Sequence, residues 1–499
     1  MKKTLFSLTP IALSLVLATT AWAAPSVRLS GNTVSIQEAV TNEMLPQIKE
    51  SVAKVRNPAE LSFYLAKLTQ EEFNRIISLY PAMSSLRVEY GQRITDLSGL
   101  AKLKKLNSIS LSEVSAGDFT PLAGLTSLQS VRITANGMTN LGWMKDLKQL
   151  RTIEISSSGL TDLNGIPSLP LMNRVTINKA APNDLTPLVE ALPNLTDLTM
   201  HYIRANDLSP LAKLTKMKSL SLYGAEVADF SPLAQCPALV KLDYYASKTP
   251  DFSALGKLTQ VKEFHGGLTK LDSISWLENL PNLESLTLFA EPISDYTPLT
   301  KSKLQKLKIW SMRKPVGDLT PVSQIPTLKE LVFWTVEGAS NSKQLAALTN
   351  LDKVEVRTYN KKGGEPFDLS AANGWDKARE VTIHECIVAN ADGLAGLKSA
   401  GRVRLTRVTG PSDSPVSVAA IAKNPVVRYV DLYESNVTDV DKLAESGTIE
   451  NINLAKVRGV KSIAALQKMP ALRSLTVTKG AFPEEELAGF AKSVRISQR

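Results

Sequence analysis

Apolar residues recur at a fixed spacing through most of the chain, and residues 207–222 show that spacing most clearly. In this stretch, D-L-S-P-L-A-K-L-T-K-M-K-S-L-S-L, apolar residues follow one another in three-residue steps from Leu211 to Leu220, and Leu222 comes two residues later. Steps of three keep apolar side chains on one side of a tight, nearly helical curve. A final step of two is typical of a β-strand. The spacing therefore predicts one curve followed by one short strand.

The same phrase recurs along the chain, mostly at intervals of 22 or 23 residues. Its opening, Asp-x-[Ser/Thr]-Pro-apolar, occurs at Asp118, Asp184, Asp207, Asp229, Asp295 and Asp318, with looser copies at Asp96, Asp162 and Asp251. One curve and one strand cannot bury their apolar side alone, so the copies must stack on one another. A leucine ladder at this period is the leucine-rich-repeat signature. The sequence predicts an α/β solenoid: a leucine-rich-repeat horseshoe with short parallel strands on its concave face and helical caps.

The repeated phrase resembles the short repeat of the bacterial internalin family, in which D-[IL]-[ST]-P-L precedes L-x-x-L-x-x-L-x-L. The resemblance implies a curved horseshoe that grips a protein partner on its inner face. Its expected setting is adhesion or virulence, with a host surface protein as one possible partner. The immunoglobulin-like segment and cell-wall attachment modules of that family are missing here, and the usual asparagine ladder is reduced to Asn136. The chain therefore resembles a divergent member.

Four segments are expected from the limits of the repeat. Residues 1–23 carry Lys2 and Lys3, an apolar stretch and an A-x-A exit, which indicates a signal peptide cut after Ala23. Residues 24–72 show helical apolar spacing and should form an N-terminal cap. About 18 repeats occupy residues 73–480, with irregular repeats after 341, and residues 481–499 should form a closing helix.

Charge, apolar stretches and cysteine spacing limit the expected partners, cellular location and disulfide bonding. The formal net charge of +10 is mild for 499 residues, and no tight basic run with interleaved aromatic residues occurs, so no nucleic-acid partner is expected. After residue 23 no stretch is long enough to cross a membrane, so the protein should be secreted or periplasmic. Cys236 and Cys386 fall six repeats apart, on the order of 29 Å, and no disulfide between them is expected.

The strands carry a cluster of aromatic residues at one position. The residue just after each L-x-L strand should face the concave surface, and this column turns aromatic in the middle of the chain although aromatic residues are only 6% of the whole. The candidate binding residues of this column are His201, Tyr223, Tyr245, Phe289, Trp310, Trp334 and Arg357, and His265 joins them from the neighbouring x column. Such a row could form the core of an interface. Alternatively, the rings could stack on one another or lie under a cap or an insertion.

No enzyme signature or paired-cysteine metal site occurs, and the three histidines fall too far apart to share a metal, so no catalytic residue, metal or cofactor is expected. The sequence thus predicts an exported protein-binding module. Two alternatives remain: a periplasmic scaffold or inhibitor with a bacterial partner, and a binder of glycan or peptidoglycan, because aromatic rows also stack on sugar rings.

Overall fold

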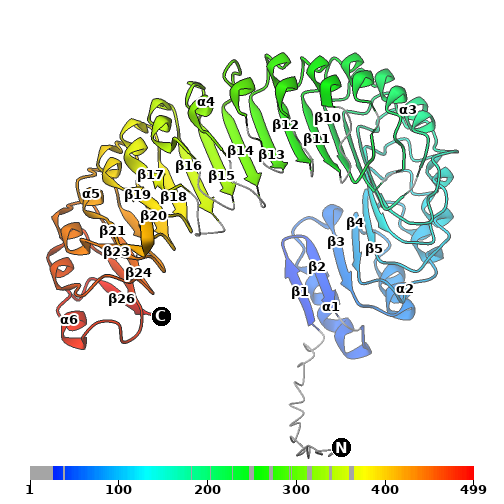
Figure 1. Ribbon diagram of the computed structural model, residues 1–499. Helices are drawn as coiled ribbons and strands as arrows, with labels where there is room; N and C mark the ends of the chain where they lie inside the picture. The colour runs from blue at the N-terminus through cyan, green and yellow to red at the C-terminus, as the bar shows by residue number, and fades with distance from the viewer. Residues whose placement is uncertain are drawn as a thin grey trace, which may run out of the picture.

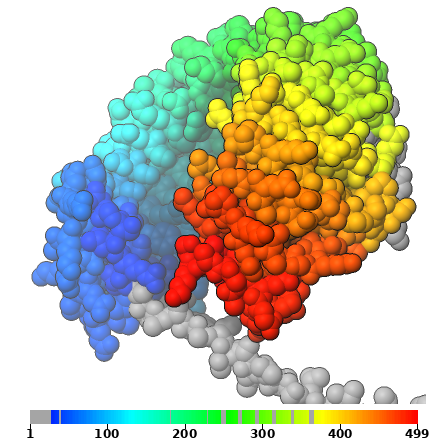
Figure 2. All heavy atoms as spheres, turned by 90° about the vertical axis from the view of Figure 1, so that its left-hand side faces the viewer, coloured from blue at the N-terminus to red at the C-terminus, as the bar shows by residue number. Residues whose placement is uncertain are grey.

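The computed structural model describes residues 26–37, 40–180, 182–202, 204–227, 229–246, 252–268, 273–290, 293, 295–311, 317–335, 340–358 and 365–499. The predicted signal peptide lies outside these residues. The described chain forms an arc in which the strands line the inner side and the turns and short helices line the outer side (Figure 1). Viewed from one end, the arc encloses a hollow between its N-terminal coils, in blue and cyan, and its C-terminal coils, in orange and red (Figure 2).

Each regular coil begins with a capped 3-10 turn. In the turn Ser209–Lys213, the Ser209 N–H donates to Asp207 Oδ1 at 2.8 Å, and Pro210 occupies a position at the turn start where no N–H is needed. The same 2.8 Å bond is made by the carboxylates of Asp96, Asp118, Asp162, Asp184, Asp229, Asp295 and Asp318. The Asp-x-[Ser/Thr]-Pro opening is therefore a capping device of the scaffold.

A single sheet of 22 strands joins the coils of the described chain. β1 and β2 form an antiparallel hairpin, and from β2 onward each strand pairs in parallel with the strand of the next coil. Its strands are β1 Ser26–Ser30, β2 Thr33–Gln37, β3 Ser62–Ala66, β4 Ser85–Glu89, β5 Ser108–Ser112, β6 Ser130–Thr134, β7 Thr152–Ser156, β8 Arg174–Asn178, β9 Asp197–His201, β10 Ser219–Tyr223, β11 Lys241–Ala246, β12 Glu263–Leu268, β13 Ser285–Ala290, β14 Lys306–Ser311, β15 Glu330–Thr335, β16 Lys353–Thr358, β18 Glu380–His384, β20 Arg402–Thr406, β22 Tyr429–Asp431, β24 Asn451–Leu454, β25 Ser474–Val477 and β26 Arg495–Gln498.

The core is a ladder of apolar side chains that runs the length of the arc. Leu211, Leu214 and Met217 from the curve, and Leu220 and Leu222 from β10, are all fully buried. In-register pairing places each of these side chains beside its equivalent in the next coil. The solenoid expected from the three-and-two spacing is thus confirmed.

The N-terminal segment differs from the helical cap expected over residues 24–72. The helices α1 Leu45–Ala53 and α2 Gln70–Leu79 are present, but β1, β2 and β3 lie in the same segment. In β2 and β3 the buried side chains alternate, as Val34 and Ile36 do, because both strands extend the sheet. The prediction was wrong here because the spacing of Leu61, Leu65 and Leu68 fits a helix as well as a strand followed by a turn.

The C-terminal segment also differs from the expected closing helix. The helix α6 Glu484–Ala488 has only five residues, and β26 follows it and pairs in parallel with β25. The sheet therefore continues into the segment that was expected to cover its end. The apolar residues Phe482, Leu487 and Phe490 of this segment are buried against the last coils.

The later coils carry additional strands, which accounts for their irregular sequence. β17 Phe367–Asp368 pairs with β19 Val388–Asn390, and β21 Val416–Ser417 pairs with β23 Val437–Thr438, in two small parallel sheets. The remaining short helices are α3 Thr186–Ala191, α4 Thr320–Ser323 and α5 Ala419–Ala422. No helix of the described residues has the length and apolar content to cross a bilayer.

The two cysteines lie in separate coils and are not bonded to each other. The Cys236 thiol points to Leu211 O at 3.3 Å, and the Cys386 thiol points to His384 O at 3.3 Å; both side chains are buried. Burial raises the pKa of the Cys236 thiol to about 11, so it stays protonated.

Candidate binding face

In-register pairing brings the predicted aromatic residues into one row. The last position of β9 pairs with that of β10, and the pairing continues strand by strand to β18. We name the row the ring column; it contains His201, Tyr223, Tyr245, Gly267, Phe289, Trp310, Trp334 and Arg357. These side chains alternate with fully buried core residues such as Leu222 and therefore project from the opposite side of the sheet.

The rings of the column contact one another in an unbroken series. His201 and Tyr223 have centroids 4.4 Å apart, and Tyr223 and Tyr245 stack at 4.6 Å with an interplanar angle of 6°. Phe289 and Trp310 follow at 3.7 Å, and Trp310 and Trp334 at 5.5 Å. The Arg357 guanidinium ends the series over the Trp334 ring, at 5.3 Å from its centroid.

Gly267 keeps the series continuous where the column lacks a ring. A Cβ at this position would lie 2.2 Å from Cδ1 of Tyr245, so the tyrosine ring lies across the glycine. The ring thereby reaches Phe289, two strands away, with centroids 5.7 Å apart. A residue with any side chain would separate the tyrosines from the Phe-Trp-Trp group.

Contacts within the column leave it half-buried. Phe289 keeps 37% of its surface exposed, whereas the other rings are of intermediate exposure. Burial raises the pKa of Tyr245 to about 12 and lowers the pKa of His201, so both remain neutral at physiological pH. The Trp334 indole N–H donates to Glu355 Oε1 at 3.0 Å, which fixes this ring.

His265 lies on β12 beside the column and binds a buried carboxylate. Its Nδ1 is 2.8 Å from Asp243 Oδ1, and Ser221 Oγ donates to Asp243 Oδ2 at 2.8 Å. Burial opposes ionisation of Asp243, but the hydrogen bonds from His265 and Ser221 outweigh it and hold its pKa below the usual value. Ser221 and His265 both bind the aspartate and not each other, so the three residues fix the sheet surface and do not form a nucleophile–base pair.

One exposed ring was missed by the sequence analysis. Tyr202 directly follows the column position of β9, adopts a left-handed conformation with φ of 57°, and is 70% exposed. Its ring lies over Gly224, the equivalent residue of the next coil. The same left-handed position is occupied by Glu385, Arg407, Glu434 and Lys456 in later coils. A tyrosine followed one repeat later by a glycine was the signal that could have revealed this position.

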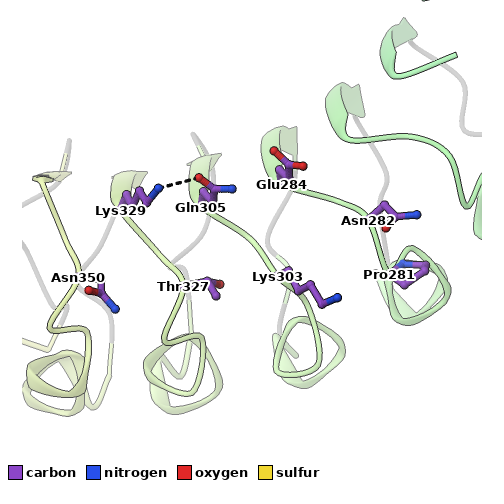
Figure 3. A pocket seen from close by; sticks show the side chains of 8 residues that line it. All are labelled: Pro281, Asn282, Glu284, Lys303, Gln305, Thr327, Lys329 and Asn350. Atoms are coloured by element: carbon purple, nitrogen blue, oxygen red, sulfur yellow. Dashed lines mark hydrogen bonds between the residues drawn. The ribbon is translucent and has the colours of Figure 1, made fainter. Parts of the chain in front are cut away.

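A groove of about 470 Å³ lies at the opposite end of the strands from the ring column (Figure 3). Glu284, Gln305 and Lys329 each immediately precede a strand, and Lys329 Nζ donates to Gln305 Oε1 at 3.0 Å. The remaining lining residues are Pro281, Asn282, Lys303, Thr327 and Asn350. The groove therefore shares no residue with the ring column. Within the described ranges, no group of three or more His, Cys, Asp or Glu side chains could hold a metal ion.

Comparison with known proteins places the fold. No protein-family model and no curated protein matches the sequence. A leucine-rich-repeat protein of Leptospira interrogans has a similar structure, with a TM-score of 0.54 and 12% identity over 85% of this chain and 97% of that chain. An internalin of Listeria monocytogenes has a TM-score of 0.49 and 21% identity, over 66% of this chain and 88% of that chain. The predicted leucine-rich-repeat solenoid is therefore confirmed as the fold.

Proposed function

We propose that this protein binds another protein through the ring column on the inner side of its arc. The observation that carries the proposal is the continuous, half-buried series of rings from His201 to Trp334, closed by Arg357. Contiguous aromatic surface on a rigid support offers a large contact area at small entropic cost. Recognition here needs no reaction step.

The ring contacts favour a protein partner over a glycan. Stacking of a sugar ring on an aromatic side chain uses the flat face of the aromatic ring. In the Tyr223–Tyr245 pair these faces are covered by the partner ring, because the rings stack at 4.6 Å and 6°. The exposed surface of this pair then consists mainly of ring edges and hydroxyl groups, which suit the mixed apolar and polar contacts of a protein interface.

Alanine at Trp310 and Trp334 tests the proposal. The immobilised protein would be used to capture partners from periplasmic, cell-surface and host-cell extracts, and the captured proteins would be identified and titrated. We expect the W310A/W334A variant to weaken partner binding by at least about 30-fold, because aromatic residues at the centre of an interface typically contribute 2 kcal/mol or more.

The matched control is Y90A, which removes a 51% exposed ring that lies outside the column. Thermal unfolding of all variants shows whether the solenoid stays folded. Unchanged affinity of a folded W310A/W334A variant would refute the proposal. Capture of cell-wall glycan instead of protein, with the same dependence on the two tryptophans, would establish the glycan alternative.

The cellular setting belongs to the same proposal. The features of residues 1–23 support export, and the resemblance of the repeated phrase to the internalin repeat supports an adhesion or virulence role with a host surface protein as partner. A periplasmic scaffold or inhibitor is the alternative. Fractionation decides between them: protein in the culture supernatant or at the cell surface supports the first setting, and retention in the periplasm supports the second.

A further inference from the structure

Several ion pairs of the strand face in the described chain share one arrangement, in which a carboxylate lies between two bases, whereas others, such as Arg132–Glu154, are single pairs. Glu330 is 3.0 Å from Lys308 and 3.9 Å from Lys353. Asp243 lies between Lys241 and His265, and Glu380 lies between Arg402 and Arg404.

The arrangement continues beyond the ring column. Glu385 is 3.4 Å from Arg357 and 2.8 Å from Arg407. Arg407 also lies 2.5 Å from Glu434, which is 2.8 Å from Lys456. The two bases hold the pKa of Glu434 at about 2, with Lys456 as the larger cause and Arg407 as the next. The ring column and this charged row therefore form one continuous surface that begins with aromatic residues and ends with ion pairs.

In these pairs the base is more exposed than the acid. The Glu330 side chain is 19% exposed, against 31% for Lys308 and 39% for Lys353. Lys456 is 58% exposed and Glu434 only 25%. Longer side chains account for part of this difference, because lysine and arginine extend their charged ends toward water. Lys353 and Arg407 are each shared between two carboxylates, so the eight lysine and arginine side chains of these ion pairs face six carboxylates. This count is independent of side-chain length, and it leaves a modest excess of positive charge above the less exposed carboxylates.

The charge and the rings point to the same type of partner group. The edge of an aromatic ring carries partial positive charge, whereas its face carries partial negative charge. The Tyr223 and Tyr245 faces are turned toward each other, and the Glu355 carboxylate beside the column already accepts from Trp334 and lies 3.0 Å from Lys353. The outer layer of this face therefore presents ring edges, Arg357 and lysine ammonium groups, all of which attract anionic groups.

We propose that the partner presents an acidic segment of polypeptide, with apolar side chains among its carboxylates, to the ring column and the adjoining charged row. This inference rests on the proposed protein-binding function and adds the chemical class of the partner. Apolar side chains would pack on the rings, and the carboxylates would replace water around the exposed bases. Charge complementarity would also accelerate association at low salt.

A pair of synthetic peptides tests the proposal. One peptide alternates glutamate with leucine and phenylalanine, and its control carries glutamine at every glutamate position. Fluorescence anisotropy would measure the binding of each to the purified protein at 50 and 300 mM salt. We expect the acidic peptide to bind, with affinity that falls as salt rises, and the glutamine peptide to bind at least tenfold more weakly.

Two lysine variants locate the binding surface. In K308Q/K456Q each carboxylate keeps one base, because Glu330 retains Lys353 and Glu434 retains Arg407, so the fold is preserved. We expect this variant to weaken binding of the acidic peptide roughly fivefold. The matched control K213Q/K442Q removes the same charge from the turn side of the coils, where both lysines also form ion pairs, and should leave the affinity unchanged.

Three outcomes would overturn the inference: equal binding of the two peptides, failure of the acidic peptide to bind, or equal effects of the two lysine variants. Preferential binding of an acidic polysaccharide such as heparin, with the same sensitivity to K308Q/K456Q, would also overturn it, because the partner would then not be a polypeptide. Capture that depends on Trp310 and Trp334 would persist if only this inference fails. It would be lost if the proposed function itself fails.

Discussion

At the residue scale, one glycine determines whether the aromatic residues form one surface or two. Strand register alone would place Tyr245 and Phe289 two strands apart, about 9.6 Å at the usual spacing. Their ring centroids are 5.7 Å apart because the Tyr245 ring crosses Gly267. A position without a side chain is therefore the central element of the ring column.

Replacing Gly267 by alanine should divide the ring column. The new Cβ would lie 2.2 Å from the Tyr245 ring, so the ring must rotate away and lose its contact with Phe289. We expect the free energy of unfolding to fall by about 1–3 kcal/mol, as in overpacked sites, and partner binding to weaken. Urea denaturation would measure the first effect. G401A is the control, since no atom lies within 4 Å of its Cβ position, and equal stability of the two variants would contradict this account.

Sequence reasoning located the ring column and raised stacking of its rings as an alternative, but it did not predict the contact across Gly267. The leucine spacing sets the register, and the register alone places Tyr223, Trp310 and Trp334 in one row. The ring of Tyr202 was missed because its exposure depends on a positive φ, which non-glycine residues rarely adopt and apolar spacing does not reveal. The shared ion pairs were missed because they join residues from two or three successive coils and depend on side-chain direction.

At the element scale, the repeated turn is held by a charged cap. Asp118, Asp184 and Asp207 each accept hydrogen bonds from the Ser or Thr two residues later, and these bonds hold the pKa of each carboxyl below its usual value of 3.8. The sequence predicted this role from the Asp and Pro of the phrase. Prediction from the sequence failed at the N-terminal segment, where no such phrase marks the turns and the spacing of apolar residues fits both a helix and a strand.

Low pH should therefore destabilise the solenoid, because the capping carboxylates become protonated. Because the folded pKa of each cap lies below the unfolded one, the unfolded chain binds more protons as pH falls below about 4, and stability declines there. We expect the wild-type melting temperature to fall steeply between about pH 4 and pH 2. D118N/D184N/D207N should melt lower at neutral pH and depend less on pH. The control D146N alters an aspartate outside the capping phrase and should keep the wild-type pH profile. A triple variant whose melting temperature falls as steeply with pH as that of the wild type would refute the role of these caps.

At the scale of the whole molecule, the arc has no central core. Each coil packs on its two neighbours, and the ladder of buried side chains extends from Val34 to Phe490 without closing on itself. Cooperativity then passes from coil to coil. The period of the sequence predicts this architecture. It does not predict the terminal strands β1, β2 and β26, because the contacts that cover each end of the core are not repeated elsewhere in the chain.

A defect in one coil should therefore destabilise its neighbours more than distant coils. Trp375 is completely buried, and its indole N–H donates to Leu345 O at 2.9 Å, so it joins two successive coils. Alanine at this position removes both the buried ring and the hydrogen bond, and we expect a local loss of about 3–5 kcal/mol. Hydrogen exchange should accelerate in β16, β18 and β20, while β5 to β8 keep the wild-type rates.

A matching substitution near the N-terminal end of the arc completes the test, because it should move the destabilised region to that end. Leu111 is fully buried in β5, and L111A should accelerate exchange in β4 to β7 and leave β18 to β24 unchanged. If either substitution accelerates exchange uniformly from β2 to β26, the arc unfolds as one unit. The ring column would then depend on every coil of the solenoid. If the effects stay local, the column depends only on the coils that carry it, and the two ends of the arc can vary without disturbing the binding face.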